Sequence, residues 1–163
     1  MSISLRRASI SLAMSLAMST VAVIGIAGPV HAADSPPKAT ISLDVKTVGK
    51  FGPIITDGKG LTMYMFSPDR PNVSNCEGAC LNVWPPVMLG KGETLANVEL
   101  SGGLRRSKLG VATRFDGSQQ VTYNGWALYY WVQDKVAGDV KGQWVGNVWF
   151  VMDPTGQPNT DRA

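Results

Sequence analysis

One pattern of chemically distinctive residues occurs twice in this chain, at a fixed distance of 65 positions. It consists of a tyrosine, a second aromatic residue, an aspartate and a tryptophan, which occur first as Tyr64, Phe66, Asp69 and Trp84 and again as Tyr129, Trp131, Asp134 and Trp149. Two copies are too few for a solenoid, in which three or more units must stack. Each copy must therefore bury its apolar face against the other. The repeat predicts two homologous, pseudo-symmetric halves, at about 41–90 and 105–156.

Short apolar or alternating runs predict that these halves are built from β-strands. The runs are rich in Val, Ile, Thr and aromatic residues and are separated by Gly, Pro and Asp. No stretch has the sustained 3.6-residue apolar period of a long helix. A helical turn is expected only over 74–81, capped by Ser74 or Asn75. The fold class is thus a mainly β, compact single domain over 41–156, followed by a tail at 157–163, with strands expected at 41–48, 53–56, 61–66, 107–114, 119–123, 127–132 and 147–152.

The repeated strands carry apolar residues on both faces. Residues i and i+2 of a strand share a face, so Tyr64 and Phe66 point one way while Met63 and Met65 point the other. The second copy alternates in the same manner. We therefore expect the two aromatic strands to lie centrally, to be covered on each side, and to be buried against one another.

The first 32 residues have the layout of a secretory signal peptide. A basic pair, Arg6 and Arg7, precedes a long uncharged apolar stretch, and small residues surround a cleavage point after Ala32. The alternative is an uncleaved membrane anchor. A polar, proline-containing leader is expected at 33–40. No cysteine stands at the cleavage point itself, so we expect no lipid anchor there, no membrane span in the mature chain, and a periplasmic or secreted location.

Charge and histidine content exclude two classes of function. Removal of residues 1–32 takes away two of the fifteen basic residues, leaving thirteen against twelve acidic ones and a net charge of +1. No basic run remains that would suit nucleic acid. The chain's one histidine, His31, leaves with the signal segment. Mechanisms that need an imidazole base or imidazole metal ligand are thereby excluded.

The order of these elements resembles a known bacterial family. The chain contains LTMYMFSPD, then SNCEGACLNVWPP, then a second Tyr-x-aromatic-x-x-Asp element, over about 48–154. This is similar to secreted-repeat proteins described as predicted lipoproteins with a Yx(F/W/Y)xxD motif. The resemblance implies a tandem-repeat envelope protein without an established activity, so it supplies no catalytic residue. The chain departs from the family by lacking the lipid-attachment cysteine and by having Trp144 where a small residue is expected.

Cys76 and Cys80 are the two cysteines of the chain. An even number of cysteines in an exported protein predicts a disulfide. Counting at the offset of 65 places Lys141 and Val145 at the equivalent positions of the second copy, so the bridge is not part of the repeated core. Two alternatives stay open: a redox-active pair, or soft ligands that bind copper together with Met63 and Met65.

Asp69 and Asp134 each follow an aromatic strand where the strand should end. A carboxylate there accepts backbone N–H groups and fixes the turn. The alternative hypothesis makes the pair an acid and a base, as in a glycoside hydrolase.

The tryptophans divide into two groups. Trp84 and Trp149 are repeated and are expected in the core. Trp126 and Trp144 have no aromatic counterpart in the first copy, so they are a candidate ligand surface for a glycan or a protein edge, or else ordinary half-buried residues. Arg105 and Arg106 are expected in a solvated connection.

The sequence as a whole favours an exported envelope protein without enzymatic activity, which binds an envelope protein or a glycan and carries no cofactor. The alternatives are the redox or copper-handling protein and the hydrolase described above.

Overall fold

The computed structural model describes residues 41–162, and the signal peptide and leader expected at 1–40 lie outside this range. The described chain is mainly β, as the sequence predicted, with short strands and single helical turns. Its elements in chain order are β1 (Ile41–Thr47), η1 (Gly49–Phe51), β2 (Pro53–Asp57), β3 (Tyr64–Phe66), α1 (Cys80–Val83), η2 (Leu95–Asn97), β4 (Val98–Leu100), η3 (Arg106–Lys108), β5 (Leu109–Thr113), β6 (Gln119–Tyr123), β7 (Trp126–Ala127), η4 (Val145–Asn147) and β8 (Trp149–Val151). Within 41–162, no helix has the length and apolarity that crossing a membrane requires.

Each half begins with an antiparallel hairpin, and the two hairpins have the same register. In the first, β1 pairs with β2 so that Leu43 faces Asp57. In the second, β5 pairs with β6 so that Leu109 faces Tyr123. Equivalent residues of the two hairpins are therefore 66 positions apart in the sequence, whereas the residues of the later motif are 65 positions apart. The turn after β2 is therefore one residue longer than the turn after β6, a difference that the motif alone did not show.

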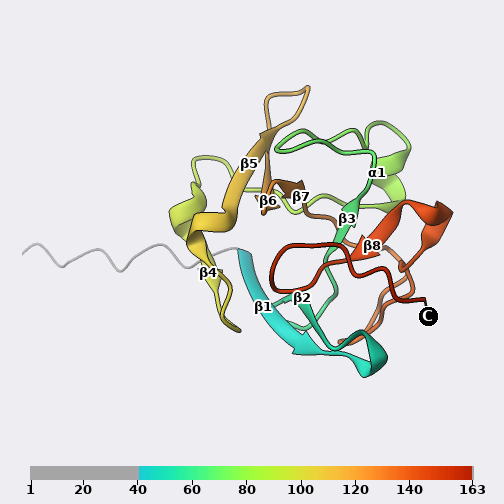
Figure 1. Ribbon diagram of the computed structural model, residues 1–163. Helices are drawn as coiled ribbons and strands as arrows, with labels where there is room; N and C mark the ends of the chain where they lie inside the picture. The colour runs from blue at the N-terminus through green and yellow to red at the C-terminus, as the bar shows by residue number, and fades with distance from the viewer. Residues whose placement is uncertain (1–40, 163) are drawn as a thin grey trace, which may run out of the picture. The chain divides into compact units, whose positions relative to one another are not determined.

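The two halves meet where the repeated tyrosines pair. Tyr64 N donates to Tyr129 O at 2.8 Å, and Tyr129 N donates to Tyr64 O at 3.0 Å. Each tyrosine also pairs with the residue two positions after the repeated tryptophan of the other half: Tyr64 faces Val151 in β8, and Tyr129 faces Pro86 in an isolated bridge. Strands β3 and β8 thus run side by side between the hairpins (Figure 1). The halves exchange partners around a pseudo-twofold axis near this tyrosine pair.

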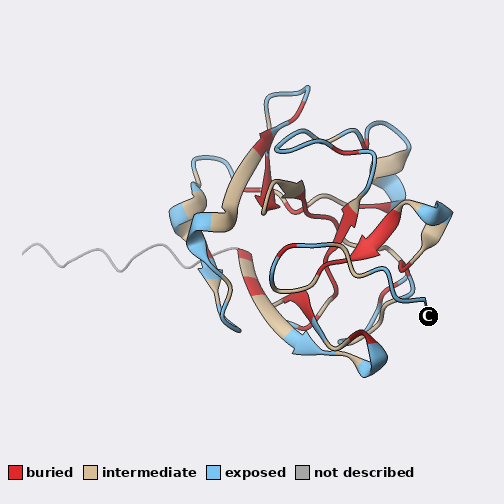
Figure 2. Cartoon of the chain, in the orientation of Figure 1, coloured by how far each residue is buried: buried red, intermediate tan, exposed pale blue. Residues whose placement is uncertain are grey.

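The central strands separate two hydrophobic cores. Met63, Met65 and Leu128 belong to one core cluster, while Tyr64 and Tyr129 belong to the other. All five are at most 1% exposed. Figure 2 shows the buried residues concentrated in the central strands and the exposed ones in the connecting loops. Both faces of the aromatic strands are covered, as the alternation of their residues predicted.

Several predicted boundaries were wrong. The strand expected at 61–66 is shorter. Of the strand expected at 127–132, only Ala127 lies in a strand, and Tyr129 forms isolated bridges, because the backbone around the tyrosine pair is irregular. Strand β4, which pairs in parallel with β1 in a three-stranded sheet, was not predicted.

The helical turn begins later than expected, and its N-cap is Ala79 without a side-chain cap, rather than Ser74 or Asn75. The Ser74 hydroxyl is instead 2.7 Å from the Tyr129 hydroxyl. The side-chain amide of Asn75 donates to the backbone oxygen of Pro68. Both side chains are therefore used in tertiary contacts and are not free to cap a helix.

The C-terminal residues follow β8 and bind to it. Asn159 N donates to Val151 O at 2.8 Å. The Gln143 side chain donates to the backbone oxygens of Asn159 and Asp161, at 2.7 and 2.9 Å. The segment expected as a tail therefore packs on the second half.

Candidate functional site at the junction of the two halves

The repeated tyrosines and aspartates form two reciprocal pairs across the junction. The Tyr64 hydroxyl donates to Asp134 Oδ2 at 2.7 Å, and the Tyr129 hydroxyl donates to Asp69 Oδ2 at 2.8 Å. Each tyrosine thus binds the aspartate of the other half. Sequence reasoning assigned each aspartate to its own turn and missed this exchange, because the partners lie 70 and 60 residues apart.

Each aspartate also accepts a backbone N–H from the loop that follows it. Asn75 N donates to Asp69 Oδ1 at 2.6 Å, and Lys141 N donates to Asp134 Oδ1 at 3.0 Å. Both oxygens of each carboxylate are therefore hydrogen-bonded inside the half-to-half junction. This arrangement favours a structural role over the acid–base pair of a hydrolase, for which a carboxylate must reach substrate.

Burial controls the ionisation of these pairs. Loss of solvent raises the pKa of the Asp69 and Asp134 carboxyls, and the hydrogen bonds they accept oppose that rise. Loss of solvent also raises the pKa of the Tyr64 and Tyr129 hydroxyls, and the neighbouring aspartates raise it further. The tyrosines consequently stay protonated and act as donors.

Four aromatic rings are stacked across the pseudo-twofold axis. Trp84 and Trp149 lie at its centre, with ring centroids 3.7 Å apart and planes 7° apart. Phe66 stacks on Trp149 at 4.3 Å, and Trp131 lies on the other side of Trp84 at 4.2 Å. We call Phe66, Trp149, Trp84 and Trp131, in that order, the aromatic stack.

The two tyrosines contact the stack edge-on. Tyr64 meets Trp84 at 5.3 Å, and Tyr129 meets Trp149 at 5.0 Å, both in T-shaped geometry. Such edge-to-face contacts are favoured by the ring quadrupole. All the aromatic residues of the repeated pattern thus form one connected group, with Trp84 and Trp149 buried in the core as expected.

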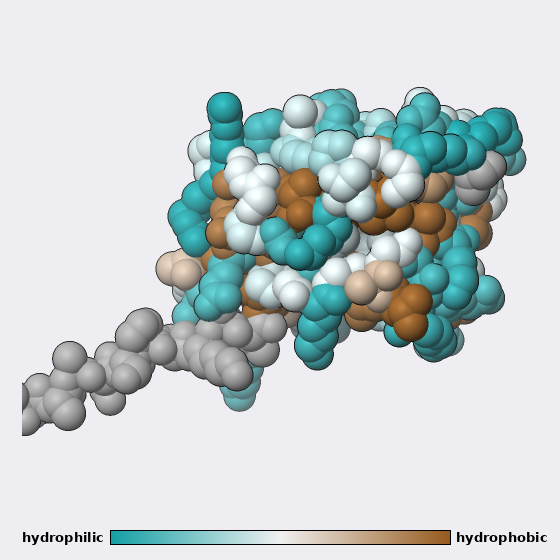
Figure 3. Space-filling view, turned by 90° about the horizontal axis from the view of Figure 1, so that it is seen from below, coloured by the Kyte–Doolittle hydropathy of each residue, from teal (hydrophilic) through white to brown (hydrophobic). Residues whose placement is uncertain are grey.

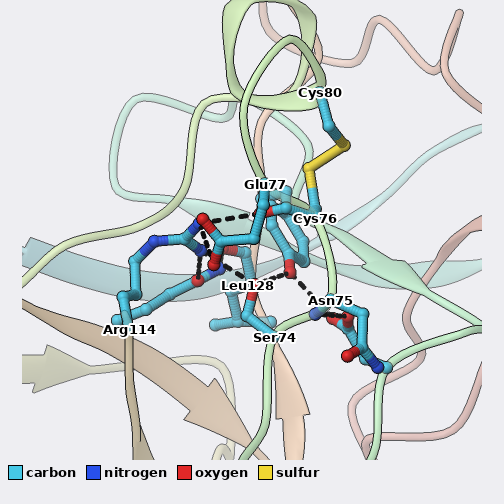
Figure 4. Close-up of a disulfide and its surroundings, with 10 residues drawn as sticks. Ser74, Asn75, Cys76, Glu77, Cys80, Arg114 and Leu128 are labelled. Carbon is cyan, nitrogen blue, oxygen red and sulfur yellow. Dashed lines mark hydrogen bonds and ion pairs between the residues drawn. A yellow bond between two sulfur atoms is a disulfide. The ribbon is translucent and has the colours of Figure 1, made fainter. Parts of the chain in front are cut away.

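The two cysteines form the predicted disulfide, with Cα atoms 5.4 Å apart. Beside the bridge lies Arg114, whose side chain is almost fully buried. Its guanidinium donates to the backbone oxygen of Cys76 at 2.7 Å and pairs with Glu77 at 2.8 Å. Figure 4 shows the guanidinium directed at the Cys76–Glu77 backbone while the sulfur atoms point away from it. The Arg114 network holds the segment that carries the first cysteine.

Arg114 also reaches the Tyr129–Asp69 pair. It donates to the Ser74 hydroxyl at 2.8 Å and to Gln120 Oε1 at 2.7 Å. Because Tyr129 donates its proton to Asp69, the Ser74 hydroxyl must donate to Tyr129. The disulfide and Arg114 therefore position the groups around one tyrosine, and the second half has no cysteine to do the same.

The equivalence of the cysteine segment needs a correction. Since Asn75 and Lys141 make the same contact to their aspartates, Lys141 corresponds to Asn75, and Gly142 corresponds to Cys76. The count at 65 had matched Lys141 with Cys76. Gly142 N donates to the Tyr64 hydroxyl at 3.1 Å. A Cβ on Gly142 would come within 2.8 Å of Tyr64 and Trp84, so only glycine fits there.

The soft-metal candidates do not converge. Met63 and Met65 are buried in one core cluster, and Cys76 lies in the other and is bridged to Cys80. Among residues 41–162, no group of three or more His, Cys, Asp or Glu side chains is placed to hold a metal ion. The copper hypothesis gains no support from this geometry and stays a prediction.

Trp126 and Trp144 are both half-buried at the margin of the first core cluster. Trp144 packs edge-on against Phe150, and its indole N–H donates to the backbone oxygen of Asp161 at 3.0 Å. The Arg162 guanidinium lies 4.2 Å from the centre of one of its rings. The C-terminal segment thus covers part of Trp144, and the candidate ligand surface stays a prediction.

A pocket of about 600 Å³ lies elsewhere, between the loops at 89–94 and 116–119. Its lining combines Leu89 with polar and glycine residues, Lys91, Glu93 and Asp116 among them. None of the residues singled out from the sequence lines it. The pocket lies outside the paired tyrosines and aspartates of the repeat, and Leu89 of the first core cluster forms part of its lining.

The two halves also match a family model independently. The model, described as a secreted repeat of unknown function, matches residues 47–88 and again 110–153. Both matches fall inside the predicted halves and together cover more than half of the chain. The chain belongs to this family. No curated protein and no solved structure matches it. In this member of the secreted-repeat family, the reciprocal tyrosine–aspartate pairs join the two copies of the repeat.

Proposed function

We propose that this secreted-repeat protein is a binding or structural module of the cell envelope, without enzymatic activity. The use of its repeated polar residues supports the proposal. Inside the junction, Tyr64 binds Asp134 and Tyr129 binds Asp69. The repeat therefore builds a frame, and contacts with a partner fall to residues outside it.

The observation that carries the proposal is the exposure of Phe115. This side chain is 101% exposed, although a phenylalanine of this size is ordinarily buried at least in part. It lies in the turn between β5 and β6. The equivalent position of the first hairpin is Gly49, so the shared frame of the repeat does not require an aromatic residue there.

The turn that carries Phe115 is held firmly in place. Arg114 N donates to Ser118 O, and Gly117 N donates to Arg114 O, each at 2.9 Å. Asp116 accepts from both the backbone and the hydroxyl of Ser118. Because the backbone of this turn is already ordered, binding through Phe115 costs little backbone entropy, which favours its use as an anchor.

The rest of the surface offers smaller apolar groups. Val73, Val83 and Val136 are 47%, 41% and 63% exposed. On the face shown in Figure 3, hydrophobic residues occur in small groups among hydrophilic ones. Phe115 is the largest of these exposed side chains in the described chain, and Val136, in a different loop of the same half, provides a matched control.

The test compares Phe115→Ser with Val136→Ser in two assays. The first measures sedimentation of purified protein with purified peptidoglycan sacculi, to detect a glycan partner. The second places a photo-crosslinking residue at 115 or 136 in producing cells, to detect an envelope protein. We expect Phe115→Ser to reduce sedimentation several-fold, or the probe at 115 to give a discrete adduct, while position 136 does neither. Equal behaviour of both positions in both assays would count against the proposal.

A further inference from the structure

The aromatic residues of the repeat form a continuous path from the surface to two buried hydroxyl groups. Starting at Trp131, ring centroids are 4.2 Å apart to Trp84 and 3.7 Å apart from Trp84 to Trp149. Tyr129 then meets Trp149 at 5.0 Å. A shorter branch leads from Trp84 to Tyr64 at 5.3 Å. Rings in such contact exchange single electrons readily, because their π orbitals are in van der Waals range.

Each branch ends in a hydrogen-bonded proton acceptor. Oxidation of a tyrosine by one electron makes its hydroxyl strongly acidic, so the reaction needs a base in place. Tyr129 donates to Asp69 at 2.8 Å and Tyr64 donates to Asp134 at 2.7 Å. Both distances lie within the range for proton transfer between positioned groups. Neither carboxylate needs to move to receive the proton.

The two ends of the aromatic stack differ in chemistry. Trp131 and Phe66 occupy equivalent, half-buried positions. Indole is oxidised by one electron far more easily than a phenyl ring, so only the Trp131 end can admit an oxidising equivalent. The Trp131 Nε1 atom is buried and has no hydrogen-bond partner in the described chain. An oxidised Trp131 therefore has no adjacent base to take its proton, and the charge is free to move inward.

We propose that the aromatic stack is a redox relay, which carries an oxidising equivalent from Trp131 to the buried tyrosines. In the first step, a high-potential one-electron oxidant, such as an oxygen-derived radical, takes one electron from Trp131 and is itself reduced. An electron then moves from Trp84 to Trp131, and from Trp149 to Trp84. Finally Tyr129 gives an electron to Trp149 and its phenolic proton to Asp69. The products are one reduced oxidant, a neutral tyrosyl radical and a protonated aspartate. The Tyr64–Asp134 branch ends in the same manner.

The environment of the pairs suits this role. Burial raises the pKa of both aspartate carboxyls, which makes them better proton acceptors than exposed aspartates. The same burial shields a tyrosyl radical from coupling with other molecules, since Tyr64 and Tyr129 are 0% exposed. The relay is independent of any partner bound through Phe115.

The experiment is photo-oxidation of the intact protein by a ruthenium(III) tris-bipyridine complex, generated with light and a sacrificial electron acceptor. Electron paramagnetic resonance of frozen samples distinguishes tyrosyl from tryptophanyl radicals. We expect a tyrosyl signal in the wild type. The Tyr64→Phe/Tyr129→Phe variant should lose it, and the matched Tyr123→Phe/Tyr130→Phe variant should keep it.

Two substitutions, each of which gives one end of the aromatic stack the residue found at the other end, test whether the oxidising equivalent enters at Trp131. Trp131→Phe gives this end the residue of the first half and should lower the tyrosyl yield several-fold. Phe66→Trp gives the other end an indole and should raise the yield. Circular dichroism and melting curves check that each variant is folded. The proposal is overturned if the wild type gives no tyrosyl signal, or if folded Trp131→Phe gives the wild-type yield. A tyrosyl signal that disappears with Tyr123 and Tyr130 instead would also overturn it.

Discussion

At the scale of single residues, the two aspartates are unusual because their carboxylates are buried and form no ion pair with any residue of 41–162. Asp69 and Asp134 are 5% and 9% exposed. Each is stabilised by one tyrosine hydroxyl and one backbone N–H. Hydrogen bonds to a charged group contribute about 1.5–3 kcal/mol each, which offsets part of the desolvation cost. The balance still favours the protonated acid more than in water, as the raised pKa of each carboxyl shows.

This raised pKa predicts a pH dependence of stability. A carboxyl with a higher pKa in the folded chain favours folding while it is protonated, and this contribution is lost as pH rises through the folded pKa. The free energy of unfolding should therefore fall as pH rises from 3.8, the ordinary aspartate value, toward neutral. The measurement is urea denaturation across this range. The Asp69→Asn/Asp134→Asn variant should show a flatter profile.

Other carboxyls do not mask the effect. Hydrogen bonds, led by those from Ser101 and from the Lys141 side chain, lower the pKa of Asp44 and Asp139 to about 2. Their contributions are lost only as pH falls below the ordinary value, in the opposite window. An identical slope above that value in the wild type and the double variant would show that the buried aspartates are not its source.

At the scale of elements, the disulfide stabilises a segment that the second half builds without one. The bridge joins residues separated by 4 positions, so it closes a very short loop. In the loop-entropy model, closing a loop of this size restricts the unfolded chain and stabilises the folded chain by about 2 kcal/mol. In the folded chain, the same segment carries Ser74 and Cys76, which bind Tyr129 and Arg114.

The Cys76→Ser/Cys80→Ser variant should therefore lose about 2 kcal/mol of unfolding free energy and remain folded. Urea denaturation measures the loss. A strong reductant should lower the wild-type midpoint to that of the variant and leave the variant unchanged. If the bridge is purely structural, it should resist mild thiols. A bridge that opens in mild thiol without loss of stability would favour the redox alternative instead.

The elements also show what the sequence could and could not predict. Alternation of residues predicted that Tyr64 and Met65 face different cores, because side-chain direction in a strand is a local property. The even number of cysteines in an exported chain likewise predicted the disulfide. Strand β4 was missed because Val98–Leu100 is short and forms only by pairing with the distant β1. The capping prediction failed because tertiary partners took Ser74 and Asn75.

At the scale of the whole molecule, the repeat is a device for joining two halves. The sequence showed that there were two copies, and the family model matches each of them. It could not show that Tyr64 binds Asp134 and not Asp69, because the motif does not say whether a tyrosine binds the aspartate of its own copy or that of the other copy. Only the antiparallel pairing of Tyr64 with Tyr129 decides this, because it directs each hydroxyl into the opposite half.

The reciprocal contacts between the two halves couple their unfolding. Each half supplies a tyrosine, an aspartate and a tryptophan whose partners lie in the other. Neither half retains these contacts alone, so the described chain should unfold as one cooperative unit and not as two.

A double-mutant cycle tests this exchange most directly. The wild type, the single variants Tyr64→Phe and Asp134→Asn, and the double variant are compared. Urea denaturation at neutral pH gives the coupling energy between the two side chains. The same cycle is run for Tyr64 with Asp69, its neighbour in the motif. The reciprocal arrangement predicts a coupling of about 1–3 kcal/mol between Tyr64 and Asp134 and less than about 0.5 kcal/mol between Tyr64 and Asp69. A strong coupling of Tyr64 to Asp69, with none to Asp134, would contradict the joining of the halves described here.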